Sequence, residues 1–157
     1  MSRYVRLVGD SAIEFTSGQI TSLANRAHLG LNGSDAFIED SKALGSSSAL
    51  TGLASIGHGA IFGIHNKAAV STSGSLANDG TIRLDIVGGD GGSSLTLAGA
   101  LTNGGDLVIG NTTLSAPDEV TAAALNNKGS IYLHGSSANQ ALLDVTAGSA
   151  GFGAAGS

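Results

Sequence analysis

The chain of 157 residues contains no cysteine and no tryptophan, and it has a single proline. The absence of cysteine excludes a disulfide framework and any thiolate metal site. Only two tyrosines and four phenylalanines are present, so the interior must be built from Leu, Ile, Val and Ala. Charged residues make up 12% of the chain, about half of the roughly 25% that is typical of soluble domains. These shortages indicate a core of small aliphatic layers beneath a polar, weakly charged surface.

Positive charge and long apolar runs are also scarce. The seven Lys and Arg residues are spread along a chain whose net charge is −5, so no basic stripe is available for phosphate backbones. No apolar run approaches the roughly 18 residues of a transmembrane helix. The first eight residues have neither the long apolar region nor the small-residue cleavage site of a signal peptide. We therefore expect neither nucleic-acid binding nor membrane insertion.

Glycine is abundant, with 25 residues, and a repeated pattern runs through the chain. The motif Leu-x-Asn-x-Gly-x-(Ile/Leu)-x-(Leu/Ile) begins at Leu76, Leu101 and Leu125, and degenerate copies begin at Leu23 and Leu53. A second pattern recurs every 25 residues, at Val70, Leu95, Val120 and Val145. Two independent positions with so strict a period indicate a stacked solenoid, in which each repeat buries its apolar face against its neighbours.

Alternation with a period of two residues makes the repeat unit a β-coil. We predict a single all-β domain over residues 1–157, a parallel β-helix solenoid with five to six coils of about 24–25 residues. Residues 1–22 form an N-terminal edge coil and residues 53–157 form regular coils. The segment 34–46 falls in the longest repeat interval, and acids early with Lys42 late give it helical character. We expect a loop or short-helix insertion there.

Each repeat position has an expected role. We expect three inward-facing apolar ladders: Leu23, Leu53, Leu76, Leu101 and Leu125; Ile82, Leu107 and Ile131; and Leu31, Ile61, Leu84, Ile109 and Leu133. A ladder of stacked amides is expected at the bend, with Ser55 in its fifth place: Asn25, Asn78, Asn103 and Asn127. The glycines that follow, which include Gly80, Gly105 and Gly129, are expected to supply a positive φ. These Asn and Gly positions are interpreted as structural.

Two exposed constellations are candidate binding residues. Asp79 and Asp106 should both face outward, roughly 8 Å apart on the strand and rung spacings, within the range used by inverting glycosidases. No basic or aromatic residues gather beside them in the pattern, so two solvated acids is the simpler interpretation. His28 and His58 share one repeat position and should form an exposed column, where a surface metal site is conceivable. Scattered solvent-exposed histidines are commoner, and we expect no metal site.

Other segments carry weaker signals. The glycine-rich stretch 87–93 is similar to the Gly-Gly-x-Gly-x-Asp calcium motif, but Ser93 stands where the aspartate should be, so we expect a loop. His65 and His134 fall elsewhere in the repeat, and Asp118 with Glu119 is interpreted as a charged corner. There is no phosphate-binding Gly-Lys-Ser/Thr motif and no Ser/His/Asp arrangement with a catalytic spacing. We expect no cofactor and no enzymatic activity.

The repeat Leu-x-Asn-x-Gly-x-Ile-x-Leu, preceded by strands such as Ser94 to Leu101, resembles filamentous-haemagglutinin-like exoproteins and autotransporter passengers of Gram-negative bacteria. The resemblance covers residues 70–157 well and residues 1–69 loosely. It implies a right-handed parallel β-helix, secretion to the cell surface as part of a longer chain, and a role in adhesion, aggregation or biofilm formation. The motif is specific for the architecture and unspecific for the ligand.

These observations favour a non-enzymatic structural or adhesive segment of a secreted or cell-surface bacterial exoprotein, with host or bacterial glycans or proteins as its partners. The alternative is a β-helical carbohydrate-active enzyme or carbohydrate-binding module. An ice-binding face ranks lower, because the Thr residues of successive repeats do not share one offset. Residues 148–157 hold few large apolar residues with which to cap a sheet edge, so we expect self-association through the solenoid ends.

Overall fold

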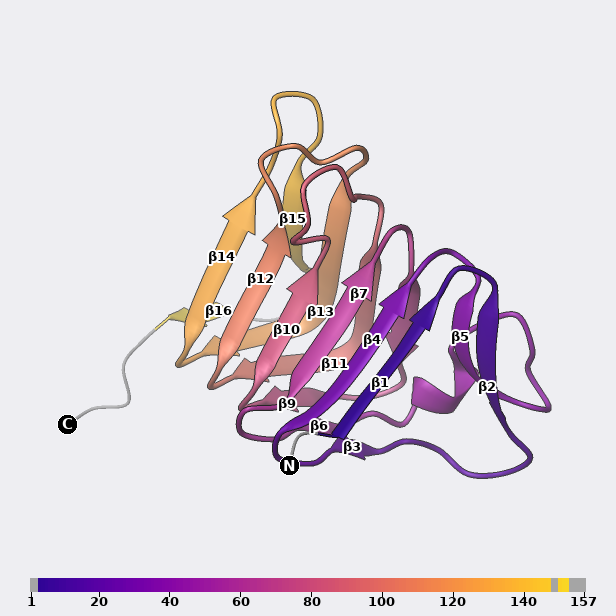
Figure 1. The fold of residues 1–157 in the computed structure, drawn as a ribbon. Helices are drawn as coiled ribbons and strands as arrows, with labels where there is room; N and C mark the ends of the chain where they lie inside the picture. The colour runs from indigo at the N-terminus through magenta and orange to yellow at the C-terminus, as the bar shows by residue number, and fades with distance from the viewer. Residues whose placement is uncertain (1–2, 148–149, 153–157) are drawn as a thin grey trace.

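The computed structural model describes residues 3–147 and 150–152, which form a β-solenoid of about six turns (Figure 1). Successive turns stack along one axis, so the colours of Figure 1 follow one another from strand to strand. One sheet holds six parallel strands: β1 (Arg3–Val8), β4 (Ala27–Asn32), β7 (Ile61–His65), β10 (Thr81–Leu84), β12 (Asp106–Gly110) and β14 (Ser130–His134). We call it sheet A. The prediction of a parallel all-β solenoid is confirmed.

The other faces are built from strands that turn a corner. The long strands β11 (Ser94–Asn103) and β13 (Asp118–Asn127) pair in parallel, and their register shifts between Leu97 and Ala100. The remaining strands of this sheet are β3 (Ser22–Leu23), β6 (Ser55–Ile56), β8 (Ala69–Thr72), β9 (Leu76–Asn78), β15 (Ala141–Val145) and β16 (Ala150–Phe152). In the first two turns, β2 (Ser11–Phe15) pairs with β5 (Ala36–Asp40) as a separate two-stranded sheet.

The core is a stack of aliphatic side chains between these faces. Sheet A contributes a ladder of inward-facing, fully buried side chains on successive turns: Leu31, Ile64, Leu84 and Ile109. Leu76, Leu101 and Leu125 form the matching ladder on the opposite sheet, and the aromatic side chain of Phe62 is also fully buried. Among the residues described, no helix has the length and apolarity needed to span a membrane.

The predicted register is correct for the turns that hold Leu76, Leu101 and Leu125, and it is wrong upstream of residue 76. Leu76 pairs with Leu101 and Leu101 with Leu125, as predicted. Upstream, Leu23 pairs with Ile56, and Ile56 pairs with Asn78. The reason is the corner that leads into sheet A: five positions separate Ile56 from its next aligned residue, Ile61, whereas Asn78 and Thr81 are three apart. The extra residues shift the degenerate motifs out of alignment.

Three further core assignments need correction. Leu31 pairs with Ile64 and not with Ile61. Val120 pairs with Leu143 and not with Val145, because the turn between β13 and β15 is two residues shorter than the 25-residue period. Leu133 follows Ile109 in register but is 45% exposed, since it belongs to the last strand of sheet A.

Segment 34–46, which was expected to be a loop or a short-helix insertion, holds a strand instead of a helix, because Ala36–Asp40 forms β5. Ala36 and Ile38 are buried on one side, and β5 pairs in parallel register with β2, so burial and cross-strand hydrogen bonds override a weak helical signal. A loop follows, and then a 3-10 turn, η1 (Ser48–Leu50), buries Ala49 and Leu50. The prediction that residues 148–157 cap the sheet edge poorly falls mainly outside the described residues.

Candidate functional site

The predicted amide ladder exists in the last three full turns and has a structural role. Asn78 donates a hydrogen bond from Nδ2 to Asn103 Oδ1 at 2.7 Å, and Asn103 donates to Asn127 Oδ1 at the same distance. Asn78 and Asn103 are fully buried and also donate to backbone carbonyls of the following turn. Asn25 does not take part, because it lies exposed in a turn and Leu23 occupies the equivalent place.

The glycines beside this ladder are required by close approach and not by a positive φ. None of Gly80, Gly105 and Gly129 is among the glycines with positive φ, so that part of the prediction is wrong. A Cβ on Gly105 would collide with the carbonyl oxygen of Gly80, and a Cβ on Gly129 would collide with that of Gly105. The backbones of successive turns therefore pack too closely here to admit any side chain.

Of the two pairs of candidate binding residues, one is exposed as predicted and the other does not form the predicted column. Asp79 and Asp106 are exposed as predicted, and Asp106 pairs with Thr81 at the start of β12. His28 and His58 do not form a column. His28 pairs with Ile61, whereas His58 lies in a two-residue turn, where its carbonyl oxygen accepts a hydrogen bond from the backbone N–H of Arg26. The extra corner residues described above place His58 three positions away from His28's partner.

A groove of about 270 Å³ runs over the outer face of β1, β4, β7 and β10. Its floor is formed by Gly30 and Gly63, which pair with each other, and it is bounded in the same column by Arg6 on one side and Arg83 on the other. The rims carry Tyr4, His28, Asn32 and His65 together with the apolar side chains of Ile86 and Val87. Two guanidinium groups thus flank a shallow, side-chain-free surface on a chain whose net charge is negative.

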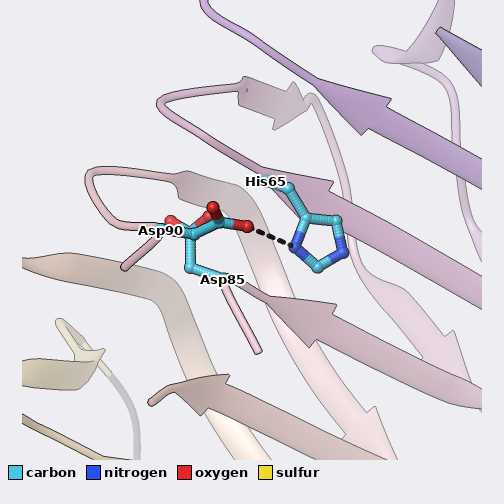
Figure 2. Close-up of side chains that lie close together, drawn as sticks. All are labelled: His65, Asp85 and Asp90. Carbon is cyan, nitrogen blue, oxygen red and sulfur yellow. Dashed lines mark ion pairs between the residues drawn. The ribbon is translucent and has the colours of Figure 1, made fainter. Parts of the chain in front are cut away.

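His65 lies at the end of this groove and joins it to a cluster of carboxylates in the next corner of the solenoid. His65, Asp85 and Asp90 each offer one ligand atom, and these atoms lie within 4.8 Å of one another (Figure 2). His65 Nδ1 faces Asp90 Oδ2 at 3.9 Å, and the two side chains are 17% and 16% exposed. The other edge of the ring covers Gly63, where a Cβ would lie 3.0 Å from Nε2.

The carboxyl group of Asp118 lies beside that of Asp85. Asp85 and Asp118 are both fully buried, and the backbone N–H of Ser93 donates to Asp85 Oδ2 at 3.0 Å and to Asp118 Oδ1 at 3.2 Å. Burial, together with the hydrogen bond and the charge of Asp85, raises the pKa of Asp118 to about 7. Burial lowers the pKa of His65, a shift that Asp85 and Asp90 oppose. We call His65, Asp85, Asp90 and Asp118 the corner cluster.

The next turn of the solenoid fixes the loop that carries Asp85 and Asp90. Asn111 donates from Nδ2 to the carbonyl oxygens of Asp85 at 2.7 Å, Val87 at 2.9 Å and Asp90 at 3.3 Å. Asp85 has a φ of +43°, a conformation uncommon outside glycine, and its Oδ1 accepts a hydrogen bond from Asn66 N. The glycine-rich segment 87–93 is therefore an ordered loop, as expected, with a defined set of backbone contacts.

The repeat pattern does not reveal the corner cluster, because counting from Leu53 gives His65 the wrong position in the repeat. With the observed register, Asn32 pairs with His65, and Asp85 directly follows Leu84, the partner of Ile64. His65 and Asp85 therefore each follow the last core residue of a sheet A strand. A search for polar residues at this one offset would have found both. Asp118 required knowledge of which loops share a corner.

Comparison of the chain with protein-family models, with curated proteins and with solved structures finds no match.

Proposed function

We propose that this chain is a non-enzymatic β-solenoid segment of a secreted or cell-surface bacterial protein, in which it acts as a stiff spacer that carries a binding face. The observation that supports the proposal is the continuity of the ladders: sheet A pairs without interruption from β1 to β14, over a core of fully buried aliphatic side chains. A chain whose turns contact only their neighbours extends in one dimension, which suits a spacer. The resemblance of its repeats to exported bacterial proteins supports the location.

The first turn of the solenoid exposes part of its apolar interior. A cavity of about 220 Å³ opens there, lined mainly by apolar side chains that include Val5, Ile13, Phe15 and Ile20. The strand β1 also leaves one edge without a partner strand among the described residues, and such edges accept further strands. The occupant that fits is the last turn of a second copy, because its strands run in the same direction and continue the parallel ladder. Head-to-tail contacts of this kind form open chains.

Sedimentation analysis over a range of concentrations tests this contact. We expect oligomers that grow with concentration, and we expect the double substitution Val5→Lys/Ile13→Lys to reduce them, because it places charges in the apolar cavity. Val87→Lys is the control, since Val87 is an exposed apolar residue outside the apolar cavity of the first turn. A wild-type chain that stays monomeric at every concentration contradicts self-association through the ends.

The surface location has its own test. Antibodies against this segment should label intact cells that produce the full-length protein as strongly as permeabilised cells. Labelling only after permeabilisation contradicts a surface role and leaves the fold unaffected.

A carbohydrate-binding module is the second candidate, and the groove on sheet A favours it. An aromatic ring at Tyr4 and two guanidinium groups at Arg6 and Arg83 suit a sugar that carries carboxylate or sulfate groups. A glycan and extracellular-matrix array with the purified chain tests this function. Binding abolished by Arg6→Ala/Arg83→Ala and retained by Asp79→Asn/Asp106→Asn assigns the groove, whereas the reverse pattern assigns the exposed carboxylates. An array without binding leaves the spacer as the function.

A further inference from the structure

The corner cluster brings one imidazole and three carboxyl groups together from three successive turns. His65 ends β7, Asp85 follows β10, Asp90 lies in the 85–93 loop, and Asp118 begins β13. Figure 2 shows the imidazole of His65 directed at the carboxylates of Asp85 and Asp90. Four ionisable groups therefore meet at one corner, beside a polar loop that is held by backbone hydrogen bonds. The amide ladder differs, because its polar groups are neutral and bond one another.

The hydrogen bonding of the cluster is incomplete. Within the described part of the chain, two of its buried atoms have no hydrogen-bond partner: Asp118 Oδ2 and His65 Nδ1. Asp118 is fully buried, so Oδ2 has no access to bulk water, and a hydrogen bond to the neighbouring carboxyl group of Asp85 forms only while Asp118 is protonated. A buried oxygen left without a partner is destabilising. When Asp118 is ionised, the corner therefore lacks a partner for Oδ2, and a cation can supply one.

The ligand set selects a class of ion. Imidazole nitrogen with carboxylate oxygen suits first-row divalent ions such as Zn²⁺, whereas Ca²⁺ and Mg²⁺ prefer oxygen ligands alone. Ligands about 2.1 Å from a tetrahedral Zn²⁺ ion lie about 3.4 Å from one another. His65 Nδ1 and Asp90 Oδ2 are 3.9 Å apart, and the ligand atoms of His65, Asp85 and Asp90 all lie within 4.8 Å of one another, so the three side chains must draw together to bind the ion.

The remaining charged groups near the cluster bear on its affinity. Arg6 and Arg83 lie close enough to His65 to disfavour its protonation, and they also oppose a bound cation. The carboxylates of Asp85 and Asp90 oppose this repulsion, because each places a ligand atom within 4.8 Å of that of His65. Asn111 positions the loop by bonding the carbonyl groups of both Asp85 and Asp90, which reduces the reorganisation that binding requires.

We propose that His65, Asp85 and Asp90, with Asp118 beside Asp85, form a binding site for one first-row divalent transition-metal ion. The ion would tie three successive turns of the solenoid together at this corner. The inference is independent of the proposed spacer or carbohydrate-binding function.

Calorimetric titration of the chelator-treated chain with Zn²⁺ is the direct experiment, with Ca²⁺ and Mg²⁺ as separate arms. We expect one Zn²⁺ per chain and a loss of affinity of tenfold or more for Asp90→Asn and for His65→Gln. Asp106→Asn and His58→Gln are the matched controls, because both residues are exposed and lie outside the cluster. Melting curves recorded without metal first establish that each variant is folded.

Nitrogen-15 spectra of the four histidine side chains provide a second readout that does not depend on affinity. Addition of one equivalent of Zn²⁺ should shift the His65 imidazole resonances and leave those of His28 and His58 in place. Binding that survives Asp90→Asn and His65→Gln, binding of Ca²⁺ in preference to Zn²⁺, or a titration without saturable uptake each overturns the proposal.

Discussion

At the scale of single residues, the fold depends on polar and small side chains as much as on the aliphatic core. Asn78 and Asn103 are fully buried amides whose hydrogen bonds link one turn to the next. Gly80, Gly105 and Gly129 allow the backbones of those turns to approach. Both kinds of residue occur in a motif that sequence analysis recognised, although the role of the glycines was assigned to the wrong physical cause.

Replacement of Asn103 by alanine should lower the free energy of unfolding by about 2–4 kcal/mol, because it removes donors and acceptors from buried partners on two neighbouring turns. Asn25→Ala is the control and should change the stability by less than about 0.5 kcal/mol, since Asn25 is exposed. Urea unfolding followed by circular dichroism measures both. Equal losses for the two variants would contradict the assignment of the ladder to Asn78, Asn103 and Asn127.

Gly105→Ala should be strongly destabilising, because its Cβ would meet the carbonyl oxygen of Gly80 and force two turns apart. We expect a loss of about 1–3 kcal/mol or more, the range for overpacked interiors. Gly74 provides a matched comparison: a Cβ there has no atom within 4 Å, and its φ lies outside the positive region. The measurement is the melting temperature of the two variants, and a tolerated Gly105→Ala would show that the turns are spaced more widely.

The raised pKa of Asp118 gives the stability a defined pH dependence when divalent ions are removed with a chelator. A carboxyl group whose pKa is about 7 in the folded state and near 3.8 in the unfolded state binds its proton more tightly when folded. Its contribution is therefore complete below pH 3.8 and is lost as the pH rises through 7. Between pH 5 and pH 7 the loss should be about 2 kcal/mol.

Asp118→Asn isolates this effect, because the amide does not titrate and the rest of the sequence is unchanged. The difference in unfolding free energy between wild type and variant should change across pH 5 to 8 in the direction stated, measured by chemical denaturation at each pH. Neutral His65 has the opposite dependence, which the comparison cancels. A difference that stays constant with pH would mean that Asp118 is ionised throughout this range.

At the scale of elements, the length of each corner sets the register of the strand that comes after it. The corner before sheet A is longer by two residues in the first turns than in the later ones. In the long form Arg26 and Gly59 adopt positive φ values of 60° and 67°, whereas in the short form a buried asparagine makes the bend. The long and the short corner have similar sequence patterns. Aligning the repeats by these patterns therefore places Leu23 and Leu53 at the wrong position.

The insertion between β5 and η1 is held by a few side-chain hydrogen bonds. Ser48 Oγ accepts from Asp40 N at 2.8 Å and donates to the carbonyl oxygen of Ala43 at 2.7 Å. Ser48→Ala should therefore raise the native-state hydrogen exchange of the Asp40 amide several-fold, equivalent to a loss of about 1 kcal/mol in local stability. Ser46 is exposed, and Ser46→Ala should leave that amide unchanged. Unaltered exchange in Ser48→Ala would mean that the loop is held by other contacts.

At the scale of the whole molecule, the architecture was predictable and the candidate site was not. The period from Leu76 to Leu125 and the alternation within each repeat were sufficient for a parallel solenoid, because stacked turns repeat one local problem of burial. The corner cluster depends instead on which loops meet, and loops differ from turn to turn. His65 and Asp118 are 53 positions apart in the sequence. No periodic pattern connects them, so only the three-dimensional arrangement reveals their common environment.

A nuclear Overhauser spectrum of the isotope-labelled chain tests the register of the solenoid directly, because it identifies which residues on neighbouring turns lie close together. The register described here predicts backbone contacts between Leu29 and Phe62 and between Asn78 and Asn103. Contacts between Leu31 and Ile61, or an antiparallel pattern in sheet A, would contradict the register and with it the corner cluster.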